Sequence, residues 1–124
     1  MTIEGDALLA RIYIGESDTF EGRPLYDAIV RRLRERGIRG VSVFRGIEGF
    51  GRSSHVHTSR ILALSEDLPI LVEIVDEEAR LRPVLDELEP MIGGGLVTLE
   101  HVQVLVYRAG PGTDAGPTQA GPIS

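Results

Sequence analysis

The sequence contains no cysteine, and all thirteen of its basic residues are arginine. A chain without cysteine forms no disulfides, no thiolate zinc sites and no cysteine nucleophile, which suits a reducing compartment. No apolar run approaches the ~18 residues that a membrane-spanning helix needs. The N-terminus also lacks the basic and apolar regions of a secretion signal. We therefore expect a cytoplasmic protein.

Positive charge is scarce, with a formal net charge of −6 at pH 7. Nucleic-acid binders normally carry a basic footprint, so no nucleic-acid partner is expected. One basic cluster exists, formed by Arg31, Arg32, Arg34, Arg36 and Arg39. It is either an anion or RNA patch or a solvated helix face. The second interpretation is favoured, because Asp27 precedes Arg31 by the four residues that suit an ion pair on a helix.

The length of 124 residues indicates a single folded domain. Residues 8–14 alternate as a strand that stops at Gly15, and a polar loop follows. Pro24 suits the first position of a helix. Leu25, Ile29 and Leu33 recur every four residues, and Gly37 predicts the end of that helix.

The second half begins with two more predicted strands. Residues 41–47 and 68–75 are rich in β-branched residues and predict strands. Asp76 is the expected N-cap of a second helix, within which Pro83 predicts a kink or a restart. A last strand is expected over residues 97–107, after Gly93–Gly95.

The order βαββαβ predicts an α+β, ferredoxin-like fold: a four-stranded antiparallel sheet with two helices on one face. We expect this domain to span residues 1–108. Residues 109–124 are rich in glycine and proline and predict a disordered tail.

Both faces of the predicted sheet are apolar. The helices are expected to cover Ile12, Ile14, Ile70, Val72, Ile74, Val102, Val104 and Val106. The opposite face would carry Tyr13, Phe44, Leu71, Val75, Leu105 and Tyr107. A solvated face normally alternates to polar residues, so this second face predicts an oligomer interface.

Two histidines, His55 and His57, stand two residues apart. On one face of a strand they could chelate a divalent metal, with Glu16, Asp18 or His101 as further ligands. Two ligands do not complete a site, and ordinary loop histidines are the simpler interpretation. Metal binding or metal tolerance stays open as an alternative function.

An enzyme is the third alternative. Glu73 is the single acidic residue of its apolar strand, and it or a histidine could act inside a dimeric α+β barrel. No nucleophile elbow or zinc-protease motif is present in the sequence. A non-enzymatic protein is therefore favoured.

Glycines gather at two places. Gly49 and Gly51 flank Phe50, and Gly93, Gly94 and Gly95 precede the last strand. Glycine lets backbone N–H groups approach an anion, although turn geometry alone also explains such clusters. The loop 51–68 between them is long enough to suggest a functional role. We expect Phe50 to pack against apolar neighbours beneath this loop.

A family resemblance is carried by "IYIGESD", "FRGIEGFGRSS", "HTSRILALSEDLPILVEIVDEE" and "GLVTLEHVQVLVYR". These stretches resemble the uncharacterised bacterial and archaeal proteins grouped as domain of unknown function 190, over residues ~8–108. That family is similar to the PII signal-transduction proteins. The resemblance implies the ferredoxin-like fold and carries no established activity.

The similarity to PII can be followed along the chain. Gly49-Phe50-Gly51-Arg52 resembles the start of the PII effector loop, and His57-Thr58 resembles a pair within it. Gly93–Gly95 resembles the glycine loop around nucleotide phosphates, and Arg108 resembles an arginine after the last PII strand. In PII homotrimers these segments meet in clefts between subunits, where ATP or ADP binds.

The resemblance therefore implies a regulator that binds a small ligand, with an adenine nucleotide as the candidate, at Gly49, Gly51, Arg52, Gly93, Gly94, Gly95 and Arg108. It implies a protein partner held by loop 51–68, and a membrane transporter or channel is the candidate. Two cations of PII are replaced by Leu96 and Val106, and residues 51–68 lack the modified tyrosine. Fewer charge-assisted contacts favour a less charged ligand such as AMP.

Overall fold

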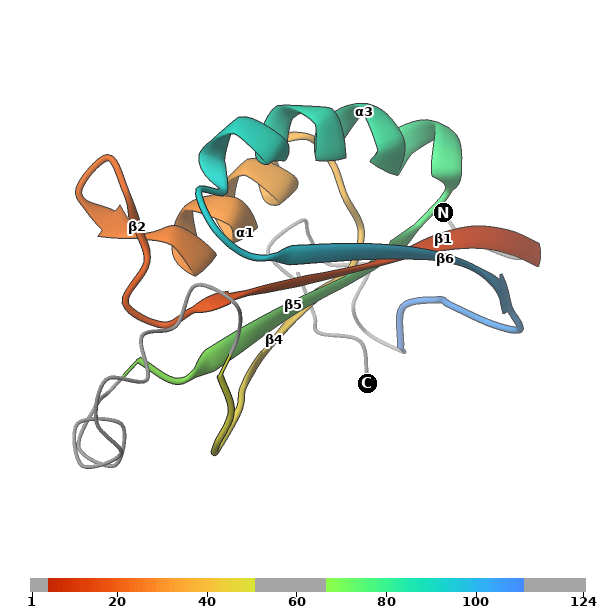
Figure 1. The fold of residues 1–124 in the computed structure, drawn as a ribbon. Coiled ribbons are helices and arrows are strands. Elements are labelled where there is room, and N and C mark those ends of the chain that lie inside the picture. The colour runs from red at the N-terminus through yellow and green to blue at the C-terminus, as the bar shows by residue number, and fades with distance from the viewer. Residues whose placement is uncertain (1–4, 51–66, 111–124) are drawn as a thin grey trace.

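The computed structural model describes residues 5–50 and 67–110, which form a sheet covered by helices on one face (Figure 1). The main elements are β1 (Gly5–Gly15), α1 (Leu25–Glu35), β4 (Val41–Arg45), β5 (Pro69–Asp76), α3 (Glu78–Leu88) and β6 (Leu96–Val104). The four strands are antiparallel and lie in the order β4-β5-β1-β6. The predicted ferredoxin-like, α+β arrangement is confirmed.

A small hairpin occupies the segment that the sequence predicted as a loop. It consists of β2 (Thr19–Phe20) and β3 (Arg23–Pro24), joined by Glu21 and Gly22 with φ of 50° and 84°. Its Phe20 packs against the edge of the core. The hairpin thereby fixes the start of α1, whose N-cap is Pro24; the helix begins one residue later than predicted.

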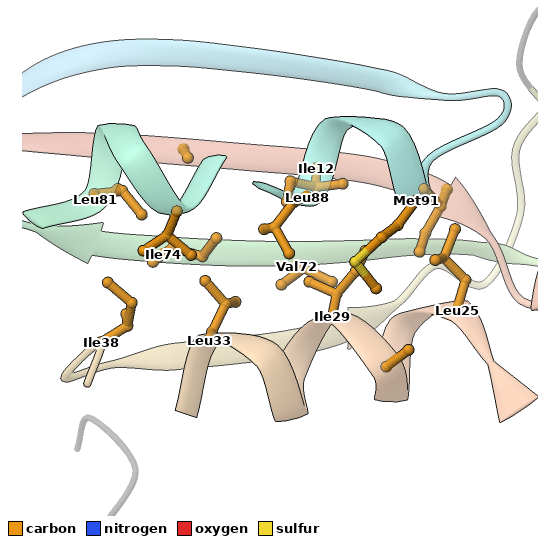
Figure 2. Packing of buried hydrophobic residues seen from close by; sticks show 14 of the residues in the cluster. Ile12, Leu25, Ile29, Leu33, Ile38, Val72, Ile74, Leu81, Leu88 and Met91 are labelled. Carbon is orange, nitrogen blue, oxygen red and sulfur yellow. The ribbon is translucent and has the colours of Figure 1, made fainter. Parts of the chain in front are cut away.

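The core lies between the sheet and the helices (Figure 2). Ile12, Val72 and Ile74 point from the sheet toward the helices, where Leu33 and Leu81 are fully buried. Burial of each such side chain contributes about 1.5–3 kcal/mol. The spacing of four residues between Leu25, Ile29 and Leu33 therefore predicts correctly which face of α1 packs on the sheet.

Helix α1 ends as its glycine predicts. Gly37 has φ of 79°, the N–H of Ile38 donates to the carbonyl of Leu33 (3.0 Å), and the N–H of Gly37 donates to that of Arg34 (3.1 Å). This pair of hydrogen bonds satisfies the last carbonyls of the helix and buries Ile38 against the core.

Helix α3 begins one residue later than predicted. Its N-cap is Glu77 rather than Asp76, whose fully buried side chain accepts bonds from the amides of Glu77 (2.7 Å) and Arg39 (3.1 Å). The helix does not restart at Pro83. The bond that Pro83 forfeits would have gone to Ala79, and both residues are exposed, so water can replace it. The helix is followed directly by a 3₁₀ turn, η1 (Glu89–Met91).

The strand register corrects the predicted face of β6. Val102 and Val104 lie opposite Ala7 and Gly5 of β1, on the face away from the helices. Val97 and Leu99 lie opposite Ile12 and Ala10 and therefore face the helices. The placement of Val102 and Val104 under the helices was wrong, and Val106 lies beyond the strand.

Two strands are shorter than predicted at their C-terminal ends. β4 ends at Arg45 and β6 at Val104, instead of residues 47 and 107. After β6 the chain turns back on the side of the sheet opposite the helices (Figure 1). The predicted tail 109–124 lies outside the described residues, apart from Ala109 and Gly110.

Candidate functional site

The glycines after β4 pack on Pro69, the first residue of β5. The amide of Gly46 donates to the carbonyl of Pro69 (2.7 Å), and a Cβ on Gly46 would stand 2.7 Å from Pro69 Cγ. A Cβ on Gly49 would stand 3.2 Å from the same atom, and Gly49 has φ of 155°. A close bend around Pro69 is thus a sufficient reason for glycine at both positions.

The other residues predicted around Gly49 are not brought into one site. Phe50 is 74% exposed, contrary to the expectation that it packs against apolar neighbours. Gly51, Arg52, His55 and His57 lie outside the described residues. The metal alternative therefore stays a prediction. Within residues 5–50 and 67–110, no group of three or more His, Asp or Glu side chains is arranged to hold a metal.

Gly93–Gly95 form the turn between η1 and β6, at the same end of the sheet as residues 46–50, which follow β4 (Figure 1). A Cβ on Gly95 would stand 2.6 Å from the carbonyl oxygen of Tyr13, so the close approach to β1 requires glycine there. A Cβ on Gly93 meets nothing within 4 Å. Packing within the chain therefore explains Gly95 and gives no reason for glycine at position 93.

Arg108 lies at the opposite end of the molecule. It follows Tyr107, whose hydroxyl donates to the carbonyl of Arg39 (2.6 Å) just before β4 begins. The β1–β6 ladder from Tyr13–Leu96 to Gly5–Val104 separates the two ends by about 26 Å. Gly93–Gly95 and Arg108 of the same chain therefore lie toward opposite ends of the sheet.

Carboxylates organise the turn after β1, close to the glycine turns. Asp18 accepts from the amide of Gly15 (3.0 Å), and Asp67 accepts from the amide of Ser17 (3.0 Å). Glu16 pairs with Arg45 at the end of β4. Hydrogen bonding to Glu16 holds the pKa of Arg45 above its ordinary value. Glu16 and Asp18, considered above as metal ligands, are engaged here in an ion pair with Arg45 and in a hydrogen bond from the amide of Gly15.

An ion cluster occupies the middle of the sheet face away from the helices. Arg11 of β1 contacts Glu73 of β5 and Glu100 of β6, at 3.1 Å each. Hydrogen bonding to Glu73, supported by Glu100, holds the pKa of Arg11 above its ordinary value. Glu73 is thus an ion-pair partner, which weakens its case as the general acid of a barrel enzyme.

Apolar side chains surround this ion cluster. Tyr13, Phe44 and Leu96 are 37%, 49% and 56% exposed, toward the end that carries Gly49 and Gly93–Gly95. Leu71 lies opposite both Tyr13 and Phe44 in the register. Ala7 and Leu9, toward the other end, are buried. The solvent-exposed part of this face therefore lies next to the glycine turns. We call this part, formed by Tyr13, Phe44 and Leu96, the open face.

The basic cluster of α1 behaves as a solvated helix face. Arg31 pairs with Asp27 (2.8 Å), and Arg36 pairs with Glu87 of α3 (2.9 Å). Hydrogen bonding to Arg36 lowers the pKa of Glu87. Arg31 thus pairs within α1, and Arg36 joins α1 to α3. Neither helix in the described part of the chain is long and apolar enough to cross a membrane.

Comparison with known proteins identifies the family. The model of DUF190, described as uncharacterised ACR, matches residues 7–104. The chain belongs to this family. A UPF0166 protein of Aquifex aeolicus is 39% identical over 97 residues, covering 78% of this chain and 91% of the relative. UPF0166 protein MJ1524 of Methanocaldococcus jannaschii is 36% identical over 99 residues, covering 79% and 91%.

Solved structures of PII-like proteins share the fold. CPII of Thiomonas intermedia K12, bound to ADP and bicarbonate, has a TM-score of 0.58 at 15% identity, covering 84% of this chain and 91% of CPII. A putative PII-like signalling protein of Thermus thermophilus has a TM-score of 0.57 at 16% identity, covering 82% and 90%. The DUF190 chain is therefore PII-like in fold, as its motifs suggested.

Sequence reasoning missed two sets of long-range contacts. The Arg11 cluster joins residues 62 and 89 positions apart, and Asp67 reaches Ser17 across 50 positions. One signal was available: Arg11 and Glu73 are opposite charges, each alone within an apolar strand. Such residues in neighbouring strands are candidates for a cross-strand pair.

Proposed function

We propose that this chain is a non-enzymatic, PII-like regulator that binds an adenine nucleotide in clefts between copies of itself. The supporting observation is the separation of its site residues. Gly49 and Gly93–Gly95 lie at one end of the sheet, and Arg108 follows the strand end about 26 Å away. A cleft that combines them takes the glycines from one copy and Arg108 from another.

The open face supplies a surface for that assembly. Tyr13, Phe44 and Leu96 form an exposed apolar group next to the glycine turns, and a second copy would remove them from water. A homotrimer, in which these faces turn inward, places three clefts at equivalent positions. Binding of ADP and AMP by CPII, which shares the fold, supports an adenine nucleotide as the ligand.

The rest of the proposed role rests on the resemblance of the sequence to PII. The 51–68 loop, which carries Arg52, would hold a protein partner in the cytoplasm, with a membrane transporter or channel as the candidate. Leu96 and Val106 stand where PII carries cations, so AMP is expected to bind at least as well as ATP.

A nucleotide panel tests the ligand. AMP, ADP, ATP and cyclic mono- and dinucleotides are added to the wild-type protein and the melting temperature is measured. A ligand at 100 times its dissociation constant stabilises by about 2.7 kcal/mol. The response should be lost in Arg52→Ala and Arg108→Ala. It should persist in Arg34→Ala, the matched control on the exposed face of α1.

Mixing two defective proteins tests whether the site is shared. Gly93→Asp places a carboxylate in the cleft without an internal clash, because its Cβ meets nothing within 4 Å. Gly93→Asp and Arg108→Ala should each fail to bind. After joint refolding, mixed assemblies contain clefts with an intact Gly93 from one copy and an intact Arg108 from its neighbour. Recovered binding supports the proposal; a mixture as inactive as its parents would refute it.

A further inference from the structure

A partly open apolar groove runs between α3 and the edge strand β6. Its volume is about 310 Å³, and its lining consists of Ile12, Leu85, Asp86, Leu88, Glu89, Ile92, Val97 and Leu99. Ile12 and Leu88 close its inner wall and belong to the core (Figure 2). Val97 and Leu99 remain 43% and 42% exposed although they face the helix side. The groove therefore exposes apolar surface that a partner could cover.

Two carboxylates border this groove without a cation. In the part of the chain that the structure describes, Glu77, Glu78 and Glu87 of the α3 region each pair with an arginine. Asp86 and Glu89, which border the groove, make no ion pair there. Their position favours an occupant that carries a positive charge beside an apolar group.

The strand beside the groove has a free edge. Within the described residues β6 pairs only with β1, so its outer backbone groups have no strand partner. An extended segment can add to such an edge through main-chain hydrogen bonds while its side chains enter neighbouring pockets. The groove and the edge together therefore fit an extended segment better than a compact ligand.

Residues 105–108 of the chain itself have the matching chemistry. Leu105 is 91% exposed and Val106 is 47% exposed. Arg108 is exposed and makes no ion pair among residues 5–50 and 67–110. Tyr107 holds this segment to Arg39, so it is presented without unfolding. An apolar pair followed by a cation complements a groove bordered by two carboxylates.

The segment cannot enter the groove of its own chain. Leu105 follows Leu99 by six residues along β6, a distance of about 20 Å. The bond from Tyr107 to Arg39 also directs the segment toward the opposite edge of the sheet. A second copy must supply the occupant.

We propose that the α3–β6 groove receives residues 105–108 of a neighbouring copy, with Arg108 facing Asp86 and Glu89. The contact joins two different surfaces, and repeated contacts of that kind close into a ring when the rotation between copies divides a full turn. The groove residue Ile92 immediately precedes Gly93, so docking brings the neighbour's Arg108 to the glycine turn. The inference rests on the proposed assembly of several copies and explains how the shared cleft is formed.

Charge reversal in both partners tests the docking. Asp86→Arg/Glu89→Arg and Arg108→Glu should each weaken self-association at least tenfold, measured by analytical ultracentrifugation. The triple variant with all three changes should recover most of that loss, because the charges are again opposite. Arg34→Glu is the control for a reversed exposed arginine and should associate as the wild type does. Circular dichroism establishes that each variant is folded.

The outcomes separate this inference from the proposed function. Weakened association in both reversals with recovery in the triple variant supports the docking, whether or not any nucleotide binds. A monomeric wild type, unchanged association in either reversal, or a triple variant as weak as its parents overturns it. If nucleotides fail to stabilise a wild-type assembly that obeys the charge pattern, the ligand proposal fails and the docking stands.

Discussion

The hydroxyl of Tyr107 donates a 2.6 Å hydrogen bond to the carbonyl oxygen of Arg39 and thereby links the two edges of the sheet. Tyr107 follows the edge strand β6, and Arg39 precedes the opposite edge strand β4. The chain after β6 is thus tied across the face opposite the helices. This tie sets the position from which Arg108 would act.

Replacing Tyr107 with phenylalanine should lower the free energy of unfolding by about 1 kcal/mol, because one partly buried hydrogen bond is lost. Urea denaturation measures the change. Tyr26→Phe is the control, since Tyr26 is also half-buried but its hydroxyl makes no hydrogen bond within the described residues. Equal losses in the two variants would argue against the tie.

The same contact predicts a loss of stability in alkali. Burial, aided by the charge of Asp76, raises the pKa of Tyr107 above its ordinary 10.0. The folded state therefore retains this proton more strongly than the unfolded state. Its contribution is fully present below about pH 10 and is lost as pH rises through the raised pKa. Unfolding curves of the wild type and Tyr107→Phe should converge there; a constant difference would contradict the assignment.

Replacing Asp76 should lower the free energy of unfolding more than replacing Tyr107. It is fully buried, accepts bonds from two backbone amides and lies 3.4 Å from the guanidinium of Arg80. Asp76→Ala leaves these donors without their acceptor and should cost about 3 kcal/mol in the free energy of unfolding. Glu77→Ala, next in sequence and only half-buried, should cost less than about 1 kcal/mol. Comparable losses in the two variants would mean that the buried hydrogen bonds of Asp76 do not contribute as expected.

Glu87 links the two helices and predicts sensitivity to acid. Its hydrogen bond with Arg36 lowers its pKa below 4.5, so the folded state holds this proton more weakly than the unfolded state. The contribution is present above about pH 4.5 and is lost as pH falls through the lowered pKa. Glu87→Gln should therefore be less stable than the wild type at neutral pH and equally stable in strong acid. Glu48→Gln, an exposed control, should track the wild type throughout.

The sequence predicted those elements that bury one unbroken face. β5 alternates through Ile70, Val72 and Ile74, and α1 repeats Leu25, Ile29 and Leu33, so one periodicity describes each. β6 has no single periodicity. Its first half turns Val97 and Leu99 toward the helices, where they stay exposed, and its second half turns Val102 and Val104 to the other face. The apolar face changes within the strand, and a single alternation cannot describe it.

The candidate site was less predictable, because the contacts that explain its residues come from distant segments of the chain. Asp76 looked like an N-cap locally, yet one of its carboxylate oxygens accepts from the amide of Arg39, 37 residues away. Glycine signals are also ambiguous by nature. Gly46 is required by Pro69 and Gly95 by Tyr13, contacts that no local pattern reveals. Gly93 is the exception, since its Cβ would meet open space.

That difference between two neighbouring glycines gives the sharpest prediction. Gly95→Ala would place a Cβ 2.6 Å from the carbonyl of Tyr13 and force β1 and β6 apart, at a cost of about 2 kcal/mol or more. Gly93→Ala should change the free energy of unfolding by less than about 0.5 kcal/mol. Urea denaturation of both variants measures the contrast. A stable Gly95→Ala would show that β1 and β6 adjust easily, and an unstable Gly93→Ala would mean that position 93 also serves the fold. If only Gly93→Ala is stable, its effect on nucleotide binding can be interpreted as an effect on the cleft.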